Sequence, residues 1–190
     1  MIECPGAADL DAIFRDINPD EIIRNLSWQC DWFQYHLHPA CSHKFGKHIE
    51  STTTIFDMTN GSIRKMMSRQ SLRLLQMGSK IAQDYYPETM GAVYVVNAPM
   101  LFAALYAIVK GFLDERTRSK IRIHSSNWQP VLLEAIDAEN LPTFLGGTCT
   151  CAHVEGGCLY SKAGPWNDYV FVGNSRQLRL KSEVEAESAQ

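Results

Sequence analysis

The sequence lacks several features that would assign it to a common class of protein. It has no apolar run of transmembrane length: residues 98–109, APMLFAALYAIV, make up only twelve residues, whereas a spanning helix needs about 20. The opening residues, MIECPGAADLDAIF, contain neither the basic region nor the long apolar stretch of a secretory signal. We therefore expect a cytoplasmic protein whose six cysteines are reduced thiols.

Charge and motif content exclude further classes. The net charge is −3 and no basic stripe is present, which argues against nucleic acid as a partner. The chain contains no G-x-S-x-G, the nucleophile motif of esterases on α/β folds. It also has no G-x-G-x-x-G after a strand, which a dinucleotide site would require. We therefore predict that the protein is not an enzyme.

Cysteine and histidine occur in two clusters, but without the spacing of a strong metal site. HLHPACSHKFGKH holds Cys41 and four histidines, and CTCAH holds Cys149, Cys151 and His153. Neither segment has the paired C-x-x-C or H-x-x-x-H pattern of zinc ligands. The favoured interpretation is surface histidines and buried thiols, so we predict no metal site and no cofactor.

The composition is that of an ordinary globular domain, with 45% hydrophobic and 21% charged residues. A chain of 190 residues is long enough for one domain with a sizeable core. We expect that domain to cover residues 1–175. Residues 176–190 are polar and acidic and predict a disordered tail.

Predicted helices and strands alternate along the chain. Asn18 as an N-cap and Pro19 at the first helical position predict a helix that ends before Pro39. Further helices are predicted over 62–84, 98–109 and 129–137, and strands over 48–58, 91–99 and 120–125. This order predicts crossover connections and a largely parallel sheet.

Two of these elements have an unusual pattern. The strand over 48–58 places Thr52 and Thr54 on one face, which suits either a partly polar cavity or an edge strand with one wet face. The helix over 98–109 is apolar on every side, which is typical of a fully buried core helix. The pattern alone does not decide between a core helix and a helix that meets lipid.

Several motifs, in one order, resemble the CRAL-TRIO lipid-binding domain. They are NLSWQCDWFQYHLHPACS, HIESTTTIFDM, QDYYPETMGAVYVVNAP, FLDERTRSKIRI, AENLPTFLGG and YSKAGPW. The likeness is to the Sec-fourteen-type phosphatidylinositol/phosphatidylcholine transfer proteins of fungi, over about residues 19–169. It implies an α/β fold in which a largely parallel sheet, flanked by helices, encloses a lipid pocket with a mobile gate helix.

The resemblance also implies roles for particular residues. Glu88 and Lys120 match positions that hold the phosphatidylinositol headgroup, where a lysine suits a phosphate and a carboxylate suits ring hydroxyls. Their alternative role is an ordinary surface ion pair. Thr52 and Thr54 match positions that contact the phosphatidylcholine headgroup, and Tyr35 is a weaker candidate for the same headgroup.

On the same likeness, residues 99–114 form the gate. One side of a gate helix faces acyl chains or core and the other faces the bilayer on opening, which explains an apolar surface all round. The implied gate and pocket residues are Met100, Phe102, Leu105, Tyr106, Val109 and Phe112.

The function implied is non-enzymatic binding and transfer of phosphatidylinositol and phosphatidylcholine between membranes. The implied setting is the cytoplasmic surface of Golgi or endosomal membranes, with a lipid kinase as a partner that receives phosphatidylinositol. The alternative is a lipid-sensing membrane-recruitment or regulatory module without transfer activity. Because MIECPGAADL matches the first strand region of the family, we expect the usual N-terminal helical region to be missing.

Overall fold

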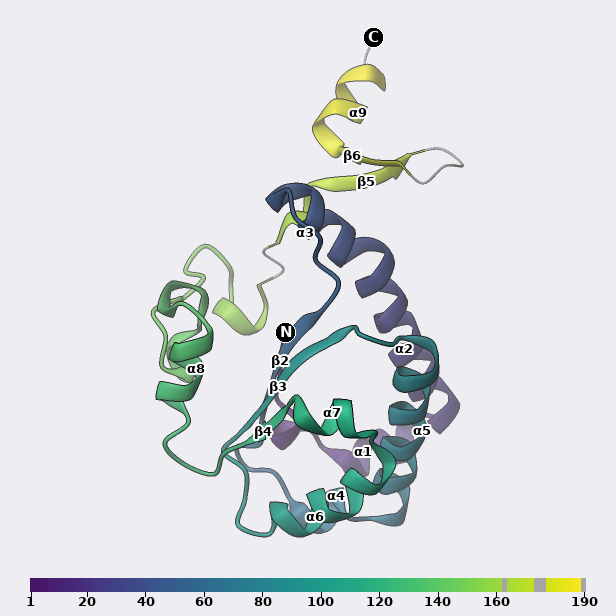
Figure 1. The fold of residues 1–190 in the computed structure, drawn as a ribbon, viewed down its shortest axis with the longest axis vertical. Coiled ribbons are helices and arrows are strands. Elements are labelled where there is room, and N and C mark those ends of the chain that lie inside the picture. Colours follow the sequence, from purple (N-terminus) through teal and green to yellow (C-terminus); the bar gives the residue numbers. More distant parts are fainter. Residues whose placement is uncertain (162–163, 173–176, 189–190) are drawn as a thin grey trace.

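A parallel sheet forms the centre of the molecule (Figure 1). The computed structural model describes residues 1–161, 164–172 and 177–188. The four strands of the sheet are β1 (Ile2–Glu3), β2 (Thr52–Asp57), β3 (Met90–Val96) and β4 (Ile121–Ile123). They lie in the order β1-β2-β3-β4, and each neighbouring pair is parallel. The predicted α/β class with a largely parallel sheet is confirmed.

Helices connect the strands and flank the sheet (Figure 1). They are α1 (Leu10–Asp16), α2 (Pro19–Trp32), α3 (His38–Phe45), α4 (Ile63–Met66), α5 (Arg69–Tyr85), α6 (Phe102–Val109), α7 (Glu115–Ser119) and α8 (Gln129–Ala135). Short 3-10 turns include η3 (Lys110–Phe112), η6 (Gly157–Leu159) and η7 (Pro165–Asn167), and η2 (Phe33–Leu37) is a π turn. In the part of the chain that the structure describes, no helix combines the length and the apolar character that crossing a membrane requires.

Side chains of β3 alternate between two cores, because successive residues of a strand point to opposite faces. Val93 and Val95 pack with residues of α4 and α6, including Leu105. Tyr94 and Val96 pack with residues around α8. The sheet therefore has an α6 face and an α8 face.

The helix that begins at Pro19 does not end before Pro39, so that prediction is wrong. It passes through the π turn η2 and continues as α3. The amide of His38 donates to the carbonyl of Phe33, five residues earlier. Pro39 then lies in the first turn of α3, where a missing N–H group is tolerated.

The prediction of a single helix over 62–84 is also wrong, because this segment forms two helices, α4 and α5. Ser68 interrupts it as the N-cap of α5, and its hydroxyl accepts the N–H of Ser71 at 3.2 Å. A serine at this position satisfies a free amide and so favours a new helix start over a continued helix.

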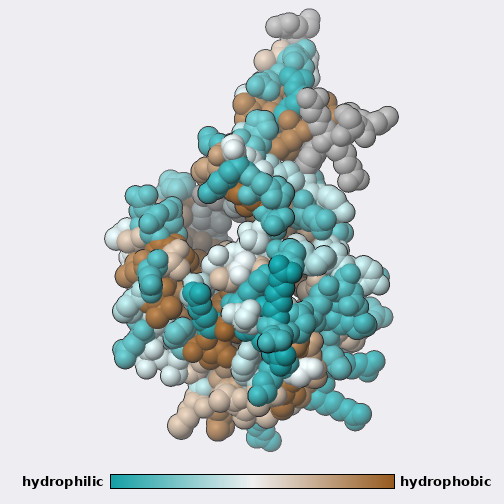
Figure 2. Space-filling model, viewed as in Figure 1, coloured by the Kyte–Doolittle hydropathy of each residue, from teal (hydrophilic) through white to brown (hydrophobic). Residues whose placement is uncertain are grey.

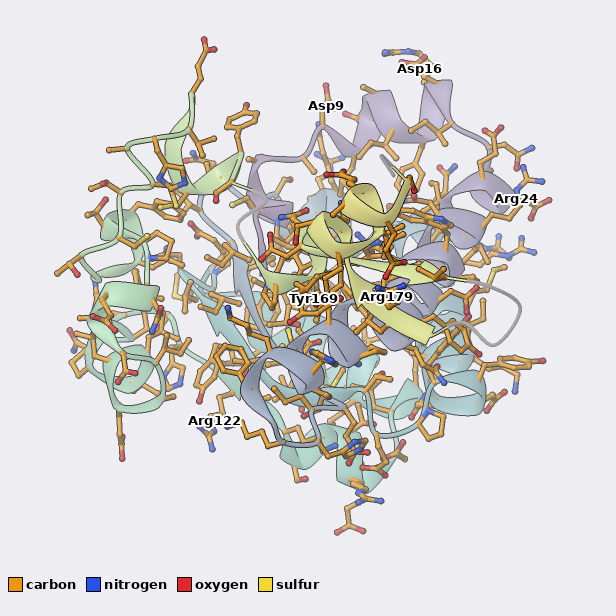
Figure 3. All side chains as sticks on the ribbon, turned by 90° about the horizontal axis from the view of Figure 1, so that it is seen from above. Asp9, Asp16, Arg24, Arg122, Tyr169 and Arg179 are labelled. Atoms are coloured by element: carbon orange, nitrogen blue, oxygen red, sulfur yellow. The ribbon has the colours of Figure 1, made fainter. Side chains whose placement is uncertain are left out.

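The acidic C-terminal segment differs from the predicted disordered tail. Strands β5 (Tyr169–Val172) and β6 (Gln177–Leu180) form an antiparallel pair, and α9 (Lys181–Ser188) follows. Arg179 donates two hydrogen bonds to Glu187, at 2.8 and 2.6 Å. Tyr169 contacts α3, with its hydroxyl oxygen 3.2 Å from Nδ1 of His43 (Figure 3). Of the predicted tail, residues 176, 189 and 190 lie outside the described residues.

Candidate functional site

The amino ends of three strands meet at one edge of the sheet, and the charged candidates lie there. Thr52, the first residue of β2, is paired with Met90, the first residue of β3. Glu88 comes just before β3 and Lys120 directly before β4. Because β3 and β4 are parallel neighbours, these two side chains meet, with Nζ of Lys120 3.6 Å from Oε2 of Glu88. The structure therefore brings the predicted pair together.

A second cation joins this pair. Arg116 of α7 forms an ion pair with Glu88, and Lys120 also donates to the carbonyl oxygen of Met90 at 2.6 Å. The Lys120 side chain is 24% exposed, whereas that of Arg116 is 73% exposed. The group of two cations and one carboxylate therefore has a net charge of +1. The guanidinium of Arg116 also presents several N–H donors in one plane, an arrangement that suits a phosphate.

Sequence reasoning missed Arg116, although the segment FLDERTRSKIRI contains it. The available signal was its position four residues before Lys120, a spacing that brings side chains to the same side of a helix. Asp114 caps α7 by accepting the N–H of Thr117 at 2.7 Å, which fixes the start of this short helix. The spacing places Arg116 and Lys120 on a similar side of α7, whereas the contact of Arg116 with Glu88 depends on the backbone of a separate segment.

The threonines of β2 lie on the α6 face. Phe56 packs against the core on that face, and alternation places Thr52 and Thr54 on the same side. Thr54 is buried, and Oγ1 of Thr52 lies 2.9 Å from Nε2 of His38. Tyr35 lies on η2, one helical turn before His38, and its side chain is exposed.

His38 corrects the interpretation of the histidines as surface residues, because it is only 4% exposed. Sequence reasoning did not select it for the headgroup site. A usable signal was its spacing from Tyr35, three residues apart on a predicted helix, which places both side chains on a similar side. The structure therefore adds His38 to the polar group that includes Thr52.

His38 gives the protein a predicted dependence on pH. Burial lowers the pKa of His38 below its ordinary value, and the Glu50 carboxylate partly opposes this shift. Below the unfolded-state pKa, about 6.5, the unfolded chain binds a proton that the folded chain resists. The contribution of His38 to the free energy of unfolding is therefore fully present above about pH 6.5 and is lost as the pH falls.

We expect His38→Gln to reduce the loss of stability that the unsubstituted protein shows between about pH 7.5 and about pH 5.5. Urea unfolding at both pH values measures this difference. His153→Gln is the control, because His153 is exposed and lies far from His38 in the sequence. An identical loss in His38→Gln and in the unsubstituted protein would contradict the assignment.

The apolar segment near residue 100 is packed on one side only. Leu105 is buried in the core of the α6 face, and Phe102 and Val109 pack beside it. Met100 and Leu101, directly before α6, are 92% and 64% exposed, and Ile108 within the helix is 38% exposed. A fully buried core helix is therefore excluded. Figure 2 shows brown and pale brown surface at the end of the molecule where α6 lies.

The remaining gate candidates have intermediate exposure, and the two ends of the segment are fixed by side-chain hydrogen bonds. Tyr106 and Phe112 are half-buried. At the start of the segment, Asn97 donates to Asp57 at 2.9 Å. At its end, Gln83 of α5 donates to the carbonyl of Phe112 at 3.0 Å and accepts from the amide of Asp114 at 2.8 Å.

Two cavities lie elsewhere in the described residues. The larger, of about 510 Å³, is lined by Arg122, His124, Val131, Glu134 and Ala135. The smaller, of about 320 Å³, is lined by residues of α1, α4 and α5 and by Ser68. Neither of these two is lined by the headgroup or gate candidates.

The structure thus defines a class: an α/β protein whose parallel sheet carries polar and charged groups at its amino edge and an exposed apolar helix on one face. Residues 7–147 match the family model described as CRAL/TRIO domain, and the chain therefore belongs to this family. The resemblance noted in the sequence is therefore confirmed.

Relatives and solved structures agree with this family. The chain is 42% identical to the Sec14 cytosolic factor of Schizosaccharomyces pombe over 167 residues, covering 88% of this chain and 57% of that protein. It is 48% identical to the phosphatidylinositol/phosphatidylcholine transfer protein SFH7 of Arabidopsis thaliana, covering 68% of this chain and 23% of that protein. The crystal structure of Sfh5 has the same fold, with a TM-score of 0.56 and 23% identity over 68% of this chain and 45% of that one. The chain thus spans little more than half the length of the Schizosaccharomyces relative, and less of the other two.

Proposed function

We propose that the protein binds phosphatidylinositol or phosphatidylcholine, one lipid at a time, and moves it between membranes without a chemical reaction. The observation that carries this proposal is helix α6, which is apolar on the side packed against the core and on the side exposed to solvent. A soluble domain rarely exposes such a surface unless a protein or a membrane covers it. The family relationship favours a membrane.

When a lipid is extracted from a bilayer, contacts with its headgroup decide which lipid the protein selects. Burial of a CH₂ group is worth about 0.8 kcal/mol relative to water, but a lipid in a bilayer already has this stabilisation. Movement of its tails into an apolar site is therefore nearly neutral. A charge-assisted hydrogen bond to a headgroup contributes about 1.5–3 kcal/mol, so a few polar side chains decide which lipid is held.

Two groups at the sheet edge supply these contacts in our proposal. Lys120 and Arg116 bind the phosphate of phosphatidylinositol, and Glu88 accepts hydrogen bonds from the inositol ring. Thr52 and Thr54 contact the phosphatidylcholine headgroup from the α6 face. Support comes from the Lys120–Glu88 distance of 3.6 Å, the Arg116 ion pair and the burial of Thr54.

Transfer between vesicles tests the proposal directly. Labelled phosphatidylinositol or phosphatidylcholine in donor vesicles should appear in acceptor vesicles at a rate proportional to protein concentration. Tight binding of vesicles and retention of one lipid, without transfer, would instead identify a lipid-sensing recruitment module. Native mass spectrometry of the protein after incubation with vesicles shows which lipid is retained.

We expect Leu101→Asp to slow transfer by about tenfold or more, because burial of an apolar side chain of this size contributes about 1.5–3 kcal/mol. Leu133→Asp is the matched control, since Leu133 is an exposed leucine of α8, on the other face of the sheet. The measurement is the transfer rate together with the fraction of protein bound to vesicles. Equal slowing in both variants would show that α6 is not the membrane-contacting surface.

The proposal extends to the cellular setting. We place the protein in the cytoplasm and, transiently, on Golgi or endosomal membranes, where it presents phosphatidylinositol to a lipid kinase. These expectations rest on the resemblance to Sec-fourteen-type proteins. A phosphatidylinositol kinase assay with purified components would test presentation, because added protein should raise the rate at which vesicle lipid is phosphorylated.

A further inference from the structure

Three cysteine thiols lie together in the segment that follows the sheet. The Sγ atom of Cys149 is 3.6 Å from that of Cys151 and 3.7 Å from that of Cys158. All three Sγ atoms lie within 4.8 Å of one another, and all three residues are partly exposed. Cys158 lies outside the CTCAH motif, so spacing alone did not reveal the group. Among the described residues the group does not include His153, which is exposed.

The backbone around the thiols holds them in place. Cys149 donates its amide to the carbonyl of Leu141 and accepts the amide of Thr143, both at 3.0 Å. The chain then turns back through hydrogen bonds from Val154 to Cys151 and from Gly157 to Val154. Because Gly156 and Gly157 both have left-handed backbone angles, with φ of 81° and 67°, the chain can return Cys158 to the side of Cys149.

The separations fit ligands of a single metal ion. Zinc binds cysteine sulfur at about 2.3 Å with tetrahedral geometry, which places two sulfurs about 3.8 Å apart. The measured 3.6 and 3.7 Å are close to this separation, whereas a disulfide would require about 2.05 Å. Thiolate ligands favour zinc and other soft ions over magnesium or calcium.

We propose that Cys149, Cys151 and Cys158 form a zinc site with three thiolate ligands and a fourth position open to water. This inference contradicts our own sequence-based prediction of no metal site, and it does not rest on the proposed lipid function. The loop that carries the thiols lies on the α8 side of the sheet (Figure 1). It leads to η7, where Trp166 packs against Trp32 of α2 at 5.8 Å between ring centroids. A bound ion would fix the chain between Cys149 and Cys158.

The test is zinc stoichiometry of the full chain, purified under reducing conditions, stripped of metal and then incubated with Zn²⁺. We expect one zinc per chain by elemental analysis and by native mass spectrometry. Cobalt as a probe should give thiolate-to-cobalt charge-transfer absorption. Cys158→Ser should weaken zinc binding by about 100-fold or more, because loss of a second-shell partner already costs 10–100-fold. Cys30→Ser is the control, since Cys30 is a partly exposed cysteine of α2 outside the group.

Circular dichroism of the metal-free protein and of each variant shows whether the chain is folded, so that a loss of zinc binding can be told from a loss of the fold. If the unsubstituted chain is folded and reduced but binds no zinc, the proposal is overturned. Zinc that binds equally well to Cys158→Ser is adventitious and also overturns it, as does a site that takes Cu(I) and not zinc. If Cys158→Ser does not fold, Cys151→Ser and the unsubstituted protein provide the same comparison.

Discussion

Lys120→Ala is expected to weaken phosphatidylinositol binding by about 10- to 100-fold and to leave phosphatidylcholine binding nearly unchanged. A charge-assisted hydrogen bond to phosphate contributes about 1.5–3 kcal/mol, and 1.4 kcal/mol corresponds to a factor of about ten. Lys120 is largely shielded from solvent by Glu88 and Met90, so its charge is less screened than that of a surface lysine. The phosphate replaces the contact with Glu88, which places the effect toward the lower end of this range.

Equilibrium binding to vesicles that contain either lipid measures this selectivity. Lys80→Ala is the matched control, because Lys80 is an exposed lysine of α5 that pairs with Asp84 at 2.7 Å. Neither lipid should be affected in that variant. An equal loss of both lipids in Lys120→Ala would mean that Lys120 supports the fold and does not recognise the inositol phosphate.

Gly147→Ala should lower the free energy of unfolding by about 3 kcal/mol, at the upper end of the cost of an overpacked core. A Cβ atom at Gly147 would clash with the carbonyl oxygen of Leu141, so the backbone itself must move. That carbonyl accepts the amide of Cys149, and the amide of Gly147 donates to the carbonyl of Pro142 at 3.0 Å. The substitution therefore strains the turn that precedes the thiol group.

Urea unfolding of Gly147→Ala and Gly111→Ala gives the comparison. At Gly111 a Cβ atom would meet nothing within 4 Å, so the change should be within about 0.5 kcal/mol, as for an ordinary surface substitution. Similar free energies of unfolding for the two variants would show that the turn at Gly147 accommodates a Cβ atom by a small backbone shift at little cost. The total stability of a domain is only about 5–15 kcal/mol, so Gly147→Ala should also reduce the yield of folded protein.

The parallel sheet could be predicted from the sequence because helices and strands alternate, and that alternation depends on local patterns. The meeting of Glu88 and Lys120 follows from the same topology, since both precede neighbouring parallel strands. The roles of Arg116 and Cys158 could not be predicted in this way. Their partners are set by short turns whose backbone angles local periodicity does not reveal, such as the left-handed angle of Glu88.

Local rules also conflicted at particular residues. Proline usually marks a helix boundary, but Pro39 lies after a π turn that removes the conflict. Ser68 divides a segment whose apolar pattern is continuous, because a cap outweighs the pattern there. The burial of His38 depends on contact with β2, a tertiary contact between residues that are 14 apart in sequence.

The π turn over Phe33–Leu37 sets the direction in which the side chains of α3 point relative to those of α2. Each residue of an α-helix advances the direction of its side chain by about 100°. A deletion of one residue within the turn would restore ordinary helical hydrogen bonding and rotate His38 and Ser42 by that angle relative to α2. His38 would then lose Thr52, and Ser42 would lose the amide of Ile49 that it now accepts at 2.9 Å. Homologous chains that keep these two contacts should therefore tolerate substitutions in this segment far better than a change in its length.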